Sequence, residues 1–146
     1  MPTGSKLIGA ITFFAVGWFA ALQVLKTLPE GTPATYFPLV IALIGLTQGW
    51  MLAGVRAGAG FSAAISTGLR TSLQIAFLGL ALFALRTMFM RSANLRYDNP
   101  GEATIETLEL FLEYFLQSLT LEIWGTLLVG GVIAGIATEF AAKAWR

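Results

Sequence analysis

The sequence predicts an all-α membrane protein with four transmembrane helices and one amphipathic surface helix, in a single membrane domain over residues 1–146. Of these residues 56% are hydrophobic and only 12% are charged, whereas a soluble domain carries about 25% charged residues. The apolar residues gather in runs of about 18 to 20, which is long enough to cross the hydrocarbon core of a bilayer. A separate stretch places acidic and apolar residues on different faces of one helix.

The first two spans are expected near residues 7–26 and 36–55. The first run is too long for the apolar core of a signal peptide, so we expect it to be retained, with Lys26 at its end. A polar turn over residues 29–33 separates the two runs, and Tyr36, Phe37 and Pro38 open the second. Proline is tolerated there because the first N–H groups of a helix have no intrahelical acceptor.

The third and fourth spans are expected near residues 69–91 and 122–142. The apolar body of the third is flanked by Arg70 at one end and by Arg86 and Arg91 at the other. The segment before it, residues 61–69, is rich in small residues and is expected to be interfacial or an early helical turn. The fourth begins near Trp124, an aromatic residue suited to a membrane interface.

An amphipathic helix is expected over residues 101–118. At 100° per residue four carboxylates fall within a sector of about 60°: Glu102, Glu106, Glu109 and Glu113. One interpretation is a stripe that binds a hard cation or a partner protein. The other, which we favour, is the solvated face of an interfacial helix.

Three arginines precede that helix: Arg86, Arg91 and Arg96. Their guanidinium groups suit an oxyanion such as tellurite or a phosphate. The acids on the same side would repel an anion, so we favour side chains that reach lipid headgroups or pair with the acidic helix. This interpretation predicts an ion pair from Arg91 or Arg96 to an acid within residues 98–113.

Four glycines, at spacings that allow close helix approach, are candidates for helix packing or for docking on another membrane protein: Gly45, Gly49, Gly131 and Gly135. Packing within the bundle is favoured, and replacement of Gly131 is expected to disturb assembly more than replacement of Gly60 in a loop. Glu139 and Gln48 are candidates for a transport pathway, because polar groups within membrane spans often have that role. We disfavour this role, because Glu139 lies near a helix end and Gln48 is uncharged.

The composition disfavours an enzyme. Histidine and cysteine are both absent, which removes imidazole bases, thiolate chemistry and the commonest metal ligands. We expect no catalytic residue, no metal site and no cofactor. The net charge of +1 gives no reason to expect nucleic acid as a partner.

Short motifs along the whole chain resemble the TrgA family, small inner-membrane proteins associated with tellurite resistance in purple alphaproteobacteria. They begin with Met1-Pro2-Thr3, Gly17-Trp18-Phe19-Ala20-Ala21 and Leu28-Pro29-Glu30-Gly31-Thr32-Pro33, and continue through Ile44-Gly45, Gly49-Trp50, Arg56-Ala57-Gly58, Gly68-Leu69, Arg96-Tyr97-Asp98, Glu113-Tyr114, Gly125-Thr126-Leu127-Leu128 and Gly130-Gly131. The entry Tyr36-Phe37-Pro38 departs from the more polar entry expected of the family. The resemblance implies a location and an association with resistance, and it carries no mechanism.

Basic residues near the helix ends set the expected orientation. With four spans, one side holds the termini and five basic residues, Lys6, Arg56, Arg70, Lys143 and Arg146, with the single acid Glu139. The other side holds four basic residues and seven acids. We expect both termini in the cytoplasm and, by the resemblance, a bacterial inner membrane.

Two functions fit these observations. In the first, the protein is a non-catalytic accessory subunit whose partners are the lipid bilayer and other integral membrane subunits; the resemblance favours a photosynthetic or respiratory complex. In the alternative, it is a small component of a solute or oxyanion transporter. Residues 31–50 are similar to the small four-helix subunits of tripartite tricarboxylate transporters, which supports that alternative.

Overall fold

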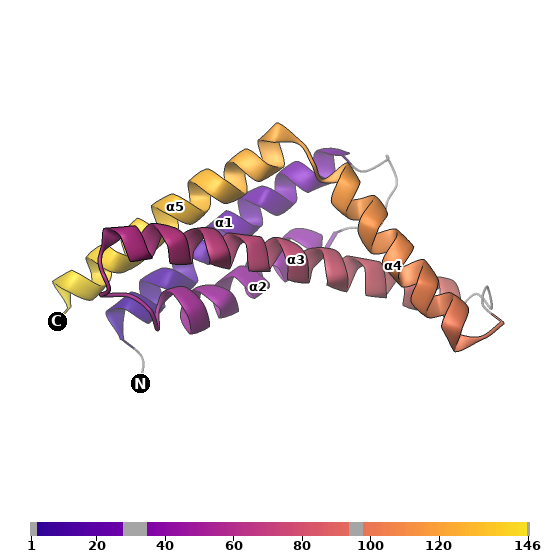
Figure 1. Ribbon diagram of the computed structural model, residues 1–146, viewed down its shortest axis with the longest axis horizontal. Helices are drawn as coiled ribbons and strands as arrows, with labels where there is room; N and C mark the ends of the chain where they lie inside the picture. The colour runs from indigo at the N-terminus through magenta and orange to yellow at the C-terminus, as the bar shows by residue number, and fades with distance from the viewer. Residues whose placement is uncertain (1–2, 28–34, 94–97, 146) are drawn as a thin grey trace.

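The computed structural model describes residues 3–27, 35–93 and 98–145, and every regular element in these ranges is helical. The elements are α1 (Gly4–Thr27), α2 (Phe37–Gln48), the π-helical segment η1 (Gly49–Ala53), α3 (Phe61–Ala93), α4 (Pro100–Gln117) and α5 (Leu121–Ala144), as Figure 1 shows. The predicted all-α fold is therefore confirmed.

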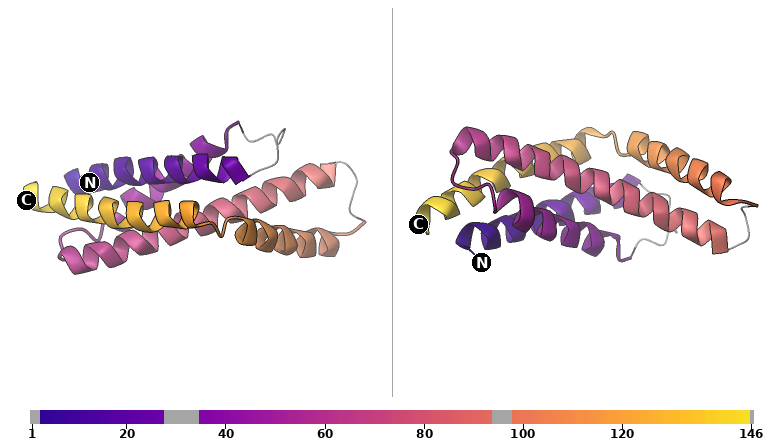
Figure 2. Two further views of the ribbon diagram at one scale, coloured as in Figure 1. Left: turned by 90° about the horizontal axis from the view of Figure 1, so that it is seen from above. Right: turned by 60° about the horizontal axis from the view of Figure 1, so that its bottom comes forward.

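Helices α1, α2, α3 and α5 lie side by side in a bundle, and the start of α1 and the end of α5 lie at the same end of it (Figures 1 and 2). The longest helix, α3, continues past the opposite end, where α4 returns beside it. Gln117 near the end of α4 donates a hydrogen bond of 3.0 Å to the carbonyl of Thr27, the last residue of α1. Most of α4 therefore lies beyond the end of α1.

Three helices are long and apolar enough to cross a membrane: α1, α3 and α5. Helix α2 and η1 together form a shorter apolar helix over Phe37–Ala53. The observed bounds differ most from expectation at α3, which begins at Phe61 rather than near residue 69. Residues 61–68 form its first turns, where Ala64 and Gly68 lie in close contact with Gly131 and Gly135 of α5.

Side-chain caps explain where α4 and α5 begin. The Asn99 side chain accepts a hydrogen bond of 2.9 Å from the backbone N–H of Glu102, and Pro100 occupies the first turn of α4. Thr120 accepts one of 3.3 Å from the N–H of Ile123 at the start of α5. Both contacts satisfy N–H groups that lack an intrahelical acceptor. The amphipathic helix thus begins one residue before the expected range and ends at Gln117.

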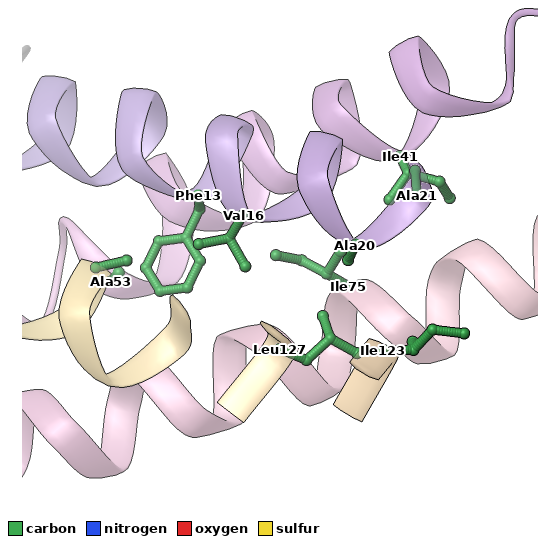
Figure 3. Packing of buried hydrophobic residues seen from close by; sticks show 10 residues of the cluster. Phe13, Val16, Ala20, Ala21, Ile41, Ala53, Ile75, Ile123 and Leu127 are labelled. Atoms are coloured by element: carbon green, nitrogen blue, oxygen red, sulfur yellow. The ribbon is translucent and has the colours of Figure 1, made fainter. Parts of the chain in front are cut away.

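The centre of the bundle is built from a few large side chains and many alanines. Phe13 of α1 and Ile75 of α3 are fully buried, and Val16, Ala20, Ile41 and Leu127 pack around them (Figure 3). Such small side chains fill the space between helices only if the backbones approach closely.

All four predicted glycines lie at close contacts between helices of this chain. A β-carbon on Gly45 would overlap the backbone of Phe13, and one on Gly49 would overlap that of Gly9, so α1 and α2 touch along this line. Gly131 and Gly135 of α5 face α3 in the same way. We call these two lines the α1–α2 and α3–α5 glycine seams. Gly60 cannot serve as the control for a substitution at Gly131. Its φ is +107°, which side chains larger than glycine rarely adopt, so any replacement there would strain the backbone.

Two glycines of α5 offer a matched test of the α3–α5 seam. A β-carbon on Gly135 would overlap the carbonyl oxygen of Ala64, whereas one on Gly125 would meet nothing within 4 Å. We expect Gly135→Ala to lower the free energy of unfolding by about 1–3 kcal/mol through overpacking, and Gly125→Ala to leave it unchanged or raise it by up to about 1 kcal/mol. Unfolding in detergent, followed by circular dichroism, measures both, and equal effects would contradict close packing at Gly135.

Candidate functional site

The end of the bundle that holds the termini contains a buried carboxylate. Glu139 of α5 is only 1% exposed. Its Oε2 accepts a hydrogen bond of 2.6 Å from the backbone N–H of Gly58, and its Oε1 accepts one of 3.0 Å from that of Gly60. A buried carboxylate is stable only with such partners, because burial removes its hydration.

The loop between η1 and α3 is shaped around this carboxylate. Gly58 and Gly60 have φ values of +98° and +107°, a region that side chains larger than glycine rarely adopt. Both N–H groups can therefore point at Glu139 from one short turn. Glu139 fixes the loop to α5, which is a structural role that its position near a helix end in the sequence did not reveal.

Aromatic contacts close the same end. The Nζ of Lys143 lies 3.9 Å from the centre of the Phe61 ring, and Phe61 packs edge-on against Phe140. A β-carbon on Gly4 would overlap the ring of Trp145, so the start of α1 packs on the end of α5. Together with Glu139, these contacts join α1, α3, α5 and the loop.

Glu139 and Gln48, the two candidates for a transport pathway, lie in different surroundings. Among the described residues Glu139 is the only buried ionisable side chain, and Gln48 is half-buried in α2. Sequence reasoning missed Thr71, Ser72 and Thr138, which are buried in α3 and α5. The Thr71 and Thr138 hydroxyls donate to carbonyls one turn earlier in their own helices, while the Ser72 Oγ has no hydrogen-bond partner in the structure.

The opposite end of the molecule is the hairpin formed by the second half of α3 and by α4. Phe111 packs on Phe77, and Tyr114 packs on Phe83 and hydrogen-bonds to the Thr87 hydroxyl at 3.1 Å. Beyond these contacts Arg91 forms an ion pair with Glu106, as the sequence predicted. Arg86 is exposed on α3, and Arg96 lies outside the described residues.

Helix α4 presents two different exposed surfaces. Glu102, Glu109 and Glu113 are exposed on one flank, while Glu106 is turned towards Arg91. An apolar stripe lies beside them and is exposed by 56–67%: Ile105, Leu108, Leu112 and Leu116. Only Leu110 is buried in this helix. Within the described ranges no group of three or more acidic residues could hold a metal ion, so the cation interpretation of the acidic stripe has no ligand cluster there.

An apolar cavity of about 70 Å³ lies where α4 and α5 meet the rest of the bundle. Its walls include Val24, Phe37, Ile75, Phe83 and Trp124. The indole Nε1 of Trp124 is buried without a hydrogen-bond partner in the structure. No pattern in the sequence pointed to this cavity, because its walls come from α1, α2, α3, α4 and α5 together.

Comparison with known proteins adds no assignment: no protein-family model, no curated protein and no solved structure matches this chain.

The role of Glu139 can be tested with a neutral isostere. In Glu139→Gln one carboxylate oxygen becomes an amide nitrogen, which cannot accept a hydrogen bond, so Gly58 or Gly60 loses its acceptor. We expect the free energy of unfolding to fall by about 1–3 kcal/mol and hydrogen exchange to increase at Gly58–Gly60. Glu122→Gln, at the exposed start of the same helix, is the control, with a loss below about 1 kcal/mol. Unchanged exchange in the loop would contradict the anchoring role.

Proposed function

We propose that this protein is a non-catalytic accessory subunit of a membrane complex, with four membrane crossings and a docking surface on α4. The observation that carries the proposal is the apolar stripe of α4, which lies beside exposed carboxylates on a helix that buries only Leu110. The contacts that hold the bundle together lie elsewhere, at the two glycine seams. Helix α4 buries fewer of its residues than any other described helix and leaves an apolar stripe exposed.

The proposed four crossings rest on the spacing of polar groups along the helices. Lys6 and Lys26 bracket about 30 Å of α1, and Arg70 and Arg86 bracket about 24 Å of α3, at a rise of about 1.5 Å per residue. These distances suit a hydrocarbon core of about 30 Å when long basic side chains reach to the headgroups.

The short helix α2 fits the same two levels. Together, α2 with 12 residues and η1 with 5 extend over about 25 Å. Tyr36 precedes this unit and Arg56 follows it. Its start contributes with Arg86 to one surface groove, and its far end contributes with Arg70 to another. The fourth crossing proposed here is thus similar in length to the apolar part of α3 and joins the same membrane levels.

The charges of the two ends support an orientation with both termini in the cytoplasm. Lys6, Arg56, Arg70 and Lys143 lie towards the end that holds the termini, against Lys26, Arg86 and Arg91 towards the other end of the described chain. Glu139, the acid that the described residues place at the first of these ends, is buried and hydrogen-bonded. The acids of α4 lie at the other end. A basic cytoplasmic side is the usual arrangement, and a bacterial inner membrane follows from the resemblance noted above.

The resemblance to the TrgA family is the source of the proposed association with tellurite resistance and with photosynthetic or respiratory membranes.

The alternative, a component of a solute or oxyanion transporter, is favoured by one observation, the buried Glu139 within α5. We rank it second because both carboxylate oxygens are bonded to backbone N–H groups of the loop. Flux of tellurite or carboxylates into vesicles that contain only this protein would support the alternative.

Site-directed photo-crosslinking in native membranes tests the docking surface. A photoreactive residue at Leu112 on α4 is expected to form an adduct with a specific membrane protein, and the same residue at Val129 on α5 is expected to react with lipid. The two positions are matched in exposure, at 56% and 60%. The double change Glu109→Lys and Glu113→Lys should reduce the adduct at Leu112, because the carboxylates flank the stripe. Indistinguishable adducts at both positions would argue against docking through α4.

A further inference from the structure

Two arginines with no acidic neighbour meet in one surface hollow on the basic end of the bundle. Arg56 follows η1, and Arg70 lies on α3; both are exposed. They line a hollow of about 370 Å³ together with Thr67, Gln74, Leu52 and Leu73. No carboxylate contributes to this lining. Within the described part of the chain neither Arg56 nor Arg70 forms an ion pair.

The nearby acid does not cancel the positive charge of the hollow. Glu139, the acid of this end of the described chain, is buried and accepts the N–H groups of Gly58 and Gly60. An anion at Arg56 and Arg70 would therefore meet two guanidinium groups and, among the described residues, no exposed carboxylate.

The polar groups of the hollow match a phosphate. A guanidinium presents planar pairs of N–H donors to phosphate oxygens, and the Thr67 hydroxyl and the Gln74 amide are further donors. Leu52 and Leu73 add apolar surface beside these groups, and Leu73 is 46% exposed. A ligand with a phosphate next to hydrocarbon chains suits both parts of the lining.

In the proposed membrane arrangement the hollow lies at a depth that suits a lipid headgroup. Arg70 marks one boundary of the apolar body of α3, and Arg56 follows the last turn of the unit formed by α2 and η1. Basic pockets between helices on the cytoplasmic side commonly bind anionic lipid headgroups.

We infer that Arg56 and Arg70 form a binding site for the phosphate of an anionic phospholipid, with the acyl chains against Leu52 and Leu73. This inference rests on the proposed membrane crossings and is independent of docking through α4. Failure of the lipid site would therefore leave the docking proposal standing, and the reverse also holds.

Native mass spectrometry of the full chain in detergent measures the site directly. Phosphatidylglycerol and phosphatidylcholine are titrated against the protein, and we expect clear selectivity for phosphatidylglycerol. Arg56→Gln and Arg70→Gln should each weaken binding of phosphatidylglycerol by about fivefold, and the double variant by more than either. Lys143→Gln, which removes one charge from the same end, is the matched control and should retain the affinity of the parent protein.

Further measurements separate the possible outcomes. Circular dichroism and the unfolding temperature establish that each variant is folded. Arg56→Lys keeps the charge but removes the planar pair of guanidinium donors, so its affinity should lie between those of the parent and Arg56→Gln. Titration with inorganic phosphate distinguishes a lipid site from a small-anion site: the inference requires that millimolar phosphate leaves the lipid bound. Equal losses in Lys143→Gln and in the arginine variants would overturn it, as would equal binding of the two lipids or displacement by phosphate.

Discussion

Backbone-to-backbone contact at glycine holds this bundle together. Between helices in a bilayer the hydrophobic effect contributes little, because lipid chains are as apolar as leucine, so association depends on van der Waals packing at close range. A β-carbon on Gly9 would lie 2.7 Å from the carbonyl oxygen of Gly49, and Gly68 meets Gly131 at similarly short range on the other seam. The remaining architecture depends on these approaches, since the alanine-rich centre would leave voids at a wider helix spacing.

The buried carboxylate of Glu139 acts at the edge of this packing. It lies one turn beyond Gly135, so the α3–α5 seam continues directly into the loop that Glu139 anchors. Van der Waals contact alone would leave the N–H groups of Gly58 and Gly60 without acceptors at that edge. One carboxyl side chain accepts from both groups and fixes the entry of α3 against α5.

The sequence predicted what depends on local pattern. Runs of apolar residues located the helices, the small residues marked both seams, and the charge pattern anticipated the pairing of Arg91 with Glu106. It left residues 61–69 open between an interfacial segment and an early helical turn, and the structure shows them to be the first turns of α3, packed on Gly135. It likewise could not show that Glu139 is buried, since its hydrogen-bond donors, Gly58 and Gly60, come from a loop about 80 residues away in the chain. The cavity beside Trp124 was beyond sequence reasoning for the same reason, as it exists only once all the helices are assembled.

The two ends of the molecule differ in how much of their surface is packed against other parts of the same chain. At the end with the termini, Glu139 binds the loop before α3, and Phe61 and Trp145 contact residues of other helices, so the bundle is closed. At the opposite end α4 is held to α3 by two ring contacts, a hydroxyl pair and one ion pair, and by the Gln117 bond to α1. Fixing each residue of such a helix costs about 1–2 kcal/mol of backbone conformational entropy, and with Leu110 alone buried, little apolar burial offsets that cost. In the proposed arrangement the missing burial comes from a partner that covers Leu108, Leu112 and Leu116, so that the position of α4 and the binding of the partner stabilise each other.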